Sequence, residues 1–207
     1  MYKLYWSEDS GALAPQIALE EIGVDYERCD IDLEAEAETE ADYLAVNPRG
    51  QIPALVLADG SVLTESAAIL LHLAETHANA GLLPAAGTTA RGVLYRWLFF
   101  AAANLYEGVL RLYYSDRYTS EPTQTAGVEV AARDFIDSNW ALLEDAIAGP
   151  YFLGDQYSVI DPYLLMLCNW HEQPEKLFAD NPKLAALCQA VRERPAVQGI
   201  WSQHFPE

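Results

Sequence analysis

The sequence predicts a two-domain protein: an α/β domain over residues 1–78, a linker over 79–87 and an all-α domain over 88–207. Three observations predict this division. Strand-type and helix-type runs alternate in the first part, and small residues with glycine and proline interrupt the pattern in the linker. Only helical periodicity follows. The first domain therefore has the order β-α-β-α-β-β-α, and the second is a helical bundle.

Two strands and a helix open the first domain. A β-type run covers Lys3–Trp6, and apolar residues at helical spacing follow over Ala12–Ile22. Gly23 comes directly after that run, where glycine commonly ends a helix. The alternation over Val24–Leu33 predicts the second strand. Apolar packing is the expected role of the two aromatic residues that end the first strand, Tyr5 and Trp6.

An acidic segment and a hairpin complete this domain. Residues Glu34–Leu44 predict an exposed helix or loop, because acidic residues alternate with alanine there. The stretch IPALVLADGSVLTE contains two β-type runs around Asp59 and Gly60, a dipeptide typical of hairpin turns. Apolar spacing over Glu65–Glu75 then predicts a helix that packs on the hairpin.

The second domain is expected to contain only helices. The first of them is long and rich in aromatic residues. Ser158 and Asp161 have the spacing of a reciprocal helix cap, with Ser158 at the N-cap and Asp161 three residues later, which predicts a structural role. The predicted helices cover Ala90–Arg117, Thr123–Ala148, Ser158–Trp170 and Pro182–Arg194.

The charge of the chain excludes several classes of partner. Thirty-one acidic residues against 12 basic ones give a formal net charge of −19, which repels nucleic-acid phosphates and anionic lipid surfaces. No apolar run approaches the roughly 20 residues that span a bilayer, and the amino terminus lacks the apolar stretch of a signal peptide. We therefore expect a cytoplasmic protein with no nucleic-acid or membrane partner.

Cysteine and histidine spacing gives no indication of a metal site. The three cysteines, Cys29, Cys168 and Cys188, form no C-x-x-C pair and are expected to be buried thiols. The four histidines include no i,i+4 pair and no H-E-x-x-H motif. The sequence therefore predicts neither a disulfide framework nor a bound metal.

Three stretches of the chain resemble the glutathione S-transferase family. Residues 47–75 are similar to the family's glutathione-site segment, and residues 3–27 are similar to the opening of bacterial beta-class members. YSVIDPYL, residues 157–164, resembles the family's capping-box motif. The resemblance covers nearly the whole chain. It implies a thioredoxin-like first domain, glutathione as co-substrate, a small-molecule electrophile and a homodimer.

The resemblance also implies a set of glutathione-binding residues. If the Ile52-Pro53 bond is cis, as the family implies, the Ile52 N–H and C=O face outward and can pair with the cysteinyl backbone. Ser66, at a helix start, can hold the γ-glutamyl carboxylate, and Glu65 can accept from its ammonium; alternatively, Ser66 only caps the helix. The implied set is Leu33, Arg49, Gln51, Ile52, Pro53, Glu65 and Ser66.

The acidic segment departs from the family pattern. Relatives commonly meet the glycyl carboxylate of glutathione with a base after the second strand, whereas residues 34–42 of this chain contain five acidic residues and no lysine. Arg49 and Gln51 are the expected replacement donors. Weak glutathione binding, or a different thiol ligand, remains an alternative.

The turn YWSEDSGALAP, residues 5–15, departs from the beta-class pattern as well. Gly11 and Ala12 stand where relatives have a cysteine-serine pair. On the first long helix, Tyr106 and Glu107 align with a histidine and a lysine of that class. Ser10 is therefore the first candidate to stabilise a glutathione thiolate, and Tyr106 is the second. A plain N-cap role for Ser10 has equal weight.

The long aromatic helix carries the candidate electrophile pocket. It has more aromatic residues than a packing stripe needs, so some are expected to line a cleft against the first domain. The alternative is that they form core or dimer interface. The candidates are Trp97, Phe100, Asn104 and Arg111.

These observations favour a glutathione transferase that conjugates the glutathione thiol to a small hydrophobic electrophile. A glutathione-dependent cis-trans isomerase is a related alternative. A non-catalytic binding or regulatory protein with the same fold is a third, favoured by Gly11, Ala12 and the acidic segment. Disulfide chemistry through a protein cysteine is disfavoured, because no cysteine lies near the turn in the sequence.

Overall fold

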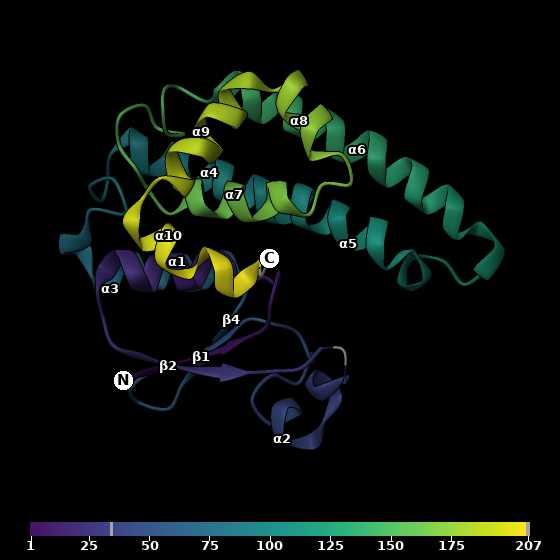
Figure 1. The fold of residues 1–207 in the computed structure, drawn as a ribbon, viewed down its shortest axis with the longest axis horizontal. Coiled ribbons are helices and arrows are strands. Elements are labelled where there is room, and N and C mark those ends of the chain that lie inside the picture. Colours follow the sequence, from purple (N-terminus) through teal and green to yellow (C-terminus); the bar gives the residue numbers. More distant parts are fainter. Residues whose placement is uncertain (34, 206–207) are drawn as a thin grey trace. The chain divides into compact units, whose positions relative to one another are not determined.

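The computed structural model describes residues 1–33 and 35–205 and divides the chain into two units. The first unit contains residues 1–83 together with 192–207, and the second contains residues 84–191. The boundary after residue 83 falls inside the expected linker, 79–87. Figure 1 shows the ribbon of both units.

The first unit is built on a four-stranded sheet with the order β2-β1-β3-β4. Strand β1 pairs in parallel with β2 and antiparallel with β3, with Leu4 opposite both Arg28 and Leu55. Strands β3 and β4 form the predicted hairpin around Asp59 and Gly60, where Gly60 has a φ of 87°. The strands cover Tyr2–Trp6 (β1), Tyr26–Asp30 (β2), Ala54–Val56 (β3) and Val62–Thr64 (β4).

Helices lie on both faces of this sheet. Within the first unit, α1, α3 and α10 lie on one face and the short α2 lies on the other (Figure 1). The strand periodicity explains this, because Leu4 and Trp6 are buried, whereas Tyr5 stacks its ring 5.3 Å from Tyr43 of α2. These helices cover Leu13–Ile22 (α1), Ala41–Leu44 (α2), Ser66–Thr76 (α3) and Pro195–His204 (α10), and the 3-10 helices cover Ala37–Thr39 and Ala78–Ala80.

The division into compact units differs from the expected domain 88–207 at its carboxyl end. Residues 192–207 belong to the first unit, because α10 packs on α1 and buries Val197, Ile200 and His204. Arg194 adds a two-bonded ion pair to Glu21 of α1, with N···O distances of 2.5 and 2.8 Å. No helix was predicted over these residues, because three buried positions in ten residues give a weak periodic signal.

The second unit is a helical bundle whose centre is α7. Every residue of α7 from Ile160 to Cys168 is buried. Within this unit α5 packs along α6, and α4 packs against α7. The helices cover Thr89–Phe100 (α4), Glu107–Tyr113 (α5), Thr125–Ala146 (α6), Ile160–Asn169 (α7), Pro174–Asp180 (α8) and Pro182–Arg192 (α9), and 3-10 turns cover Ser115–Tyr118 and Pro122–Gln124.

The first long helix differs from its prediction. A π-helix over Ala101–Tyr106 separates α4 from α5, and the helical run ends at Tyr113 rather than Arg117. Asn104 donates to the Phe100 carbonyl at 2.9 Å inside this segment, a side chain-to-backbone bond that competes with the helical ladder. Helix α8 was not predicted at all, because it is only seven residues long.

Only one of the two hydrogen bonds of the predicted reciprocal cap is present at α7. Asp161 accepts from the backbone N–H groups of Ser158 and Phe152, each at 2.7 Å, as its predicted structural role requires. The Ser158 hydroxyl, however, donates to the Asp161 carboxylate at 3.2 Å and caps no helical amide. The prediction of Ser158 as N-cap is therefore wrong, because α7 begins at Ile160 and Val159 is at the N-cap position.

Two further sequence predictions have clear outcomes. The acidic segment forms a 3-10 turn and α2 with mostly exposed residues, as expected, although Glu34 lies outside the described residues. Cys168 and Cys188 are buried with their sulfurs 3.6 Å apart, whereas Cys29 is only half-buried, which corrects its prediction. None of the described helices is long and apolar enough to cross a bilayer.

Candidate functional site

The turn before α1 is held by the hydroxyl of Ser10. This hydroxyl donates to the Ser7 carbonyl at 2.8 Å and accepts from the Ala12 N–H at 3.2 Å. Helix α1 begins at Leu13, so Ser10 lies just ahead of the helix mouth, as Pro15 in the first turn predicted. The Ser10 side chain is buried, and its one proton is directed at a carbonyl of the same turn.

The start of α3 is attached to this turn. The Ser66 hydroxyl donates to the Gly11 carbonyl at 2.8 Å, which joins two segments 55 residues apart in the sequence. Ser66 is the first residue of α3, so the amides of this first turn have no acceptor inside the helix. The structure therefore brings Ser10, Gly11 and Ser66 together, with helix N-terminal amides that favour an anion.

The segment before β3 presents an unused backbone edge. The Ile52-Pro53 peptide bond is cis, as the resemblance implied. Neither the N–H nor the C=O of Ile52 is hydrogen-bonded within the described part of the chain. The preceding Gln51 carbonyl, in contrast, accepts from Tyr43 at 2.7 Å and Asn47 at 2.6 Å. These two bonds fix the loop and leave Ile52 able to pair with an extended peptide.

A charged pair lies in the same unit. Arg49 and Glu65 approach to 3.8 Å, and their side chains are 68% and 67% exposed. Glu65 has a φ of 64°, a left-handed conformation that is uncommon for a residue with a side chain. Both charges remain hydrated, so each can exchange its partner for a ligand group at small cost. Leu33, the remaining predicted binding residue, is 41% exposed.

The predicted residues of the second unit lie along α4, the π-helix and α5. Trp97 is buried and packs edge-on against Phe100 and Phe152. Tyr106 meets the ring of Trp170 edge-on, with centroids 5.2 Å apart. The remaining candidate, Arg111, lies 3.6 Å from Glu107 and stacks over Tyr118 and Phe135.

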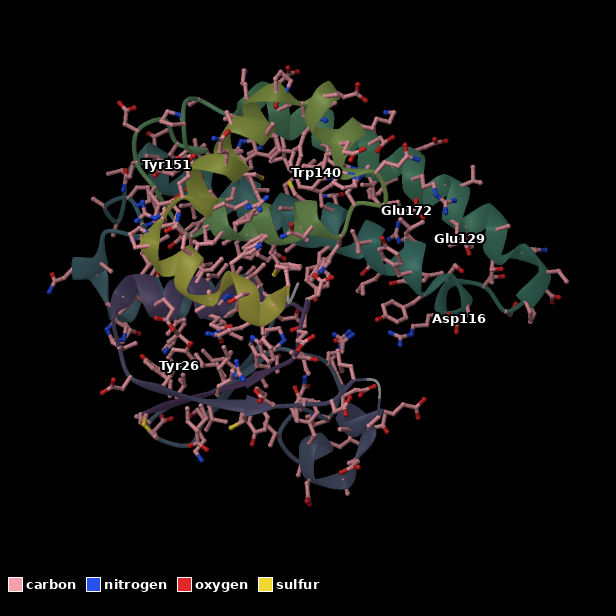
Figure 2. The ribbon with its side chains drawn as sticks, in the orientation of Figure 1. Tyr26, Asp116, Glu129, Trp140, Tyr151 and Glu172 are labelled. Atoms are coloured by element: carbon pink, nitrogen blue, oxygen red, sulfur yellow. The ribbon has the colours of Figure 1, made fainter. Side chains whose placement is uncertain are left out.

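A small cavity of about 100 Å³ in the second unit contains none of the predicted electrophile residues. Its apolar floor is formed by side chains of α5, α6 and α7, including Trp140. Charged residues at its rim are already paired: Arg133 donates twice to Glu172, at 2.6 and 3.0 Å. Glu172, Glu129 and Trp140 can be followed in Figure 2. A ligand in this cavity would meet no uncommitted charge among these groups.

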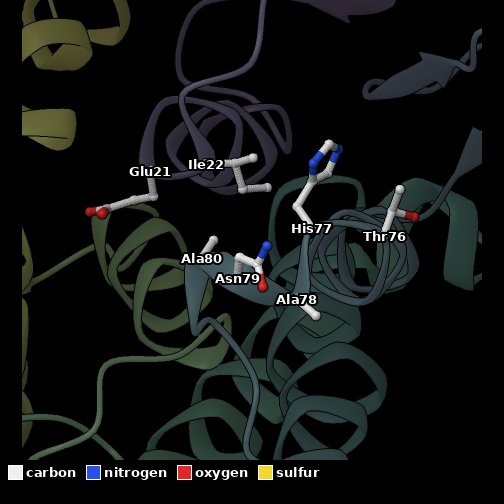
Figure 3. Close-up of a pocket in the computed structure, with 7 residues that line it drawn as sticks. All are labelled: Glu21, Ile22, Thr76, His77, Ala78, Asn79 and Ala80. Atoms are coloured by element: carbon white, nitrogen blue, oxygen red, sulfur yellow. The ribbon is translucent and has the colours of Figure 1, made fainter.

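A larger, shallow cavity of about 420 Å³ lies in the first unit (Figure 3). It is lined by the last residues of α1, by His77 after α3, and by the following 3-10 turn. Ser10 and Ser66, in contrast, lie at the N-terminal ends of these helices. Ten helical residues span about 15 Å, so this cavity and the serine site are at opposite ends of α1.

A buried polar cluster next to the turn was not predicted from the sequence. Trp6, expected to pack by apolar contact, directs its indole N–H at Gln16 and His204, at 2.7 and 2.8 Å. Gln16 also donates to Tyr26 at 3.0 Å. Gln16, a polar residue on the apolar face of α1, is the sequence feature that could have indicated this cluster. In the part of the chain that the structure describes, no group of three His, Cys, Asp or Glu residues could hold a metal ion.

Comparisons with known proteins identify the family. Residues 1–75 match the model of the glutathione S-transferase N-terminal domain, and residues 104–200 match that of its C-terminal domain. The chain is 31% identical to the glutathione S-transferase GstA of Escherichia coli O157:H7 over 202 residues, 97% of each protein. It is 43% identical to the maleylacetoacetate isomerase of Rhizobium meliloti over 81 residues, 39% of this chain and 37% of that protein.

A solved structure agrees with these matches over nearly the whole chain. The glutathione transferase homologue from Sulfitobacter, which was crystallised with bound glutathione, has a TM-score of 0.92 and 28% identity. The similarity covers 98% of both chains. The fold of this protein is therefore the glutathione S-transferase fold, with a thioredoxin-like first unit.

Proposed function

The chain belongs to the glutathione S-transferase family, and we propose that it transfers the thiol of glutathione to a small hydrophobic electrophile. The observation that carries this proposal is the backbone edge at Ile52, in the same unit as the Ser10, Gly11 and Ser66 cluster. An extended peptide could pair its backbone with Ile52 and place a free carboxylate at the amides that open α3. Glutathione, bound in the Sulfitobacter homologue, is such a peptide.

Each part of glutathione has a proposed partner. The cysteinyl backbone pairs with the N–H and C=O of Ile52, next to Pro53. The γ-glutamyl carboxylate lies at the amides that open α3 at Ser66, and its ammonium meets Glu65. Donors for the glycyl carboxylate are Arg49 and the side chain of Gln51, with Leu33 packing beside the peptide.

Ser10 is the proposed thiolate stabiliser. Its hydroxyl proton turns from the Ser7 carbonyl to the sulfur, which favours the charged form and lowers the pKa of the thiol. The thiol proton leaves to solvent, the sulfur lone pair forms the bond to carbon, and the leaving group departs with its electrons. Tyr106 is the second candidate donor. Trp97, Phe100, Asn104 and Arg111 are the proposed electrophile contacts.

Retention on immobilised glutathione and turnover of a generic aryl halide test the proposal directly. We expect both, with a bound-thiol pKa below that of free glutathione, measured by thiolate absorbance against pH. Ser10→Ala should raise this pKa by about one unit, because the thiolate loses one hydrogen bond. Ser7→Ala, a neighbouring hydroxyl in the same turn, is the matched control, and Tyr106→Phe tests the second donor.

The outcomes separate the alternatives. Absence of both retention and turnover would refute the proposed function. Retention without turnover would identify a binding or regulatory protein instead. If neither Ser10→Ala nor Tyr106→Phe changes the thiol pKa, the hydroxyl mechanism is wrong while the transferase proposal stands.

A glutathione-dependent cis-trans isomerase is the second candidate. The 43% identity to the Rhizobium isomerase is higher than the identity to GstA, although it covers only 81 residues. Isomerisation of maleylacetoacetate in the presence of glutathione, compared with its absence, tests this function. A homodimer in the cytoplasm is part of our proposal, and sedimentation of the purified chain tests the dimer.

A further inference from the structure

The last helix of the chain ends in a buried histidine. His204 is 2% exposed, and its Nε2 atom lies 2.8 Å from the indole nitrogen of Trp6 and 2.7 Å from Oε1 of Gln16. Trp6 belongs to β1 and Gln16 to α1, so one side chain of α10 contacts two other elements of the first unit. Figure 1 shows α10 lying beside α1.

The two residues that His204 contacts flank the turn with Ser10. Trp6 directly precedes Ser7, whose carbonyl accepts from the Ser10 hydroxyl. Gln16 lies in the first turn of α1, and its backbone N–H donates to Ala12 at 2.9 Å. The histidine therefore fixes the chain immediately before and immediately after this turn.

Packing alone does not explain a histidine at this position. Its Nδ1 atom is buried and has no hydrogen-bond partner among the described residues. With the proton on Nδ1, Nε2 accepts from Trp6; with the proton on Nε2, it donates to Gln16. Each tautomer leaves Nδ1 unsatisfied, which reduces stability, so a leucine would serve simple packing better.

Burial keeps the histidine neutral, and the nearby Arg28 adds to this effect. Burial lowers the pKa of His204 to about 4, and Arg28 of β2 acts in the same direction. The Arg28 guanidinium lies 4.3 Å over the Trp6 ring and pairs with Asp30. From α1 and β2, Glu20 accepts from Tyr26, whose position under the helices is labelled in Figure 2. A neutral imidazole is the form that fits this hydrogen-bond cluster.

We propose that His204 is a positioning residue, which holds Trp6 and Gln16 and thereby sets the geometry of the turn at residues 7–12. The turn carries the Ser10 hydroxyl and the Gly11 carbonyl to which Ser66 is bonded. Docking of α10 then controls how well the site stabilises a thiolate. The link to the thiol rests on the proposed function; the link to the turn does not.

Three variants of α10 test this inference. His204→Leu removes the polar contacts, and His204→Gln restores an acceptor for Trp6 and a donor for Gln16. Val197→Ala, at a fully buried position of the same helix, weakens packing without touching the cluster. The first measurement is hydrogen exchange of the amides of residues 7–16 without ligand. We expect about tenfold faster exchange in His204→Leu, and near wild-type exchange in His204→Gln.

The second measurement is the pKa of bound glutathione thiol, with glutathione affinity measured beside it. We expect His204→Leu to raise this pKa by about one unit, with affinity changed less than threefold, because in the proposed complex the Ser10 hydroxyl of this turn meets the sulfur. His204→Gln should restore the wild-type pKa. Equal effects of His204→Leu and His204→Gln, or of His204→Leu and Val197→Ala at matched thermal destabilisation, would overturn the inference.

The two measurements separate this inference from the proposed function. If the wild-type protein does not bind glutathione, the proposed function fails, whereas exchange at the turn still tests the positioning role. If glutathione binds but turn exchange is the same in His204→Leu and wild type, the positioning role is refuted and the transferase proposal remains.

Discussion

The starts of α7 and α3 both contain a buried serine beside an acidic residue, but they use these residues differently. At α7 the carboxylate of Asp161 is fully buried and accepts from two backbone amides and from Ser158. At α3 the Glu65 side chain is 67% exposed, and Ser66 bonds to the Gly11 carbonyl of another segment.

Solvent exposure of the acid distinguishes a structural helix cap from a candidate binding site. At α7 the Asp161 carboxylate is buried and already hydrogen-bonded within the protein, so it is not available to a ligand. At α3 the acid faces water and the amides of the first turn have no acceptor inside the helix. The first arrangement stabilises the bundle, and the second can receive a carboxylate and an ammonium.

The largest expected effect is at the start of α7, where Asp161 is buried. Asp161→Ala should lower the free energy of unfolding by roughly 3 kcal/mol, because two buried backbone amides lose their acceptor. Denaturant unfolding measures this loss, and Asp161→Asn, which keeps one acceptor oxygen, should lose less. Asp134→Ala on the exposed face of α6 is the control. Glutathione affinity of the folded fraction should not change; a large change would break the distinction between the two sites.

The next largest effect is a pH dependence of stability that arises from His204, in the polar cluster with Trp6 and Gln16. An exposed histidine has a pKa of about 6.5. That of His204 in the folded protein is about 4. The unfolded chain therefore binds the proton first, and the free energy of unfolding falls as pH decreases from about 6.5 to 4, by roughly 2.5 kcal/mol from this group.

Comparison of two chains isolates this contribution, because carboxylates also titrate in the same range. The stability difference between His204→Gln and wild type, measured by denaturant unfolding at several pH values, should shift in favour of the variant below about pH 6.5. A difference that stays constant between pH 7 and 4 would contradict a buried neutral His204.

A smaller effect is expected from the serine at each helix start. Ser66→Ala should weaken glutathione binding about tenfold, because it frees the Gly11 carbonyl and loosens the junction between α3 and the turn. Ser158→Ala should leave this affinity unchanged. Calorimetric titration with glutathione compares them, and equal losses in both variants would show that the effect is global destabilisation.

The smallest expected effect comes from the exposed pair. Arg49→Ala should weaken glutathione binding two- to threefold, and by less at high salt, because an exposed charge contributes about 0.5 kcal/mol. Lys176→Ala removes the same charge from the second unit and is the control. A loss of similar size in Lys176→Ala would assign the effect to net charge rather than to Arg49.

Much of the local structure was predictable from short stretches of sequence. Gly23 ends α1 in the left-handed conformation, with a φ of 73°, and Asp59-Gly60 makes the β3–β4 turn. Pro15 correctly placed Ser10 ahead of the helix mouth. These signals act over a few residues, through steric limits on φ or a missing N–H, so they need no knowledge of the rest of the fold.

Other features depended on segments far apart in the chain. The sequence identified Ser66 as a candidate but not its bond to the Gly11 carbonyl, and it identified Asp161 as a cap but not its bond to Phe152. The π-helix between α4 and α5 likewise left no pattern distinct from an ordinary helix.

The order of elements over residues 1–76, the linker and the backbone segment at Ile52 could therefore be predicted from the sequence, because local chemistry specifies each. The packing of α10 in the first unit, and the contacts of His204 with Trp6 and Gln16 across nearly 200 residues, could be seen only in the folded chain. A buried polar contact needs partners on several elements at once, and no stretch of sequence contains all of them.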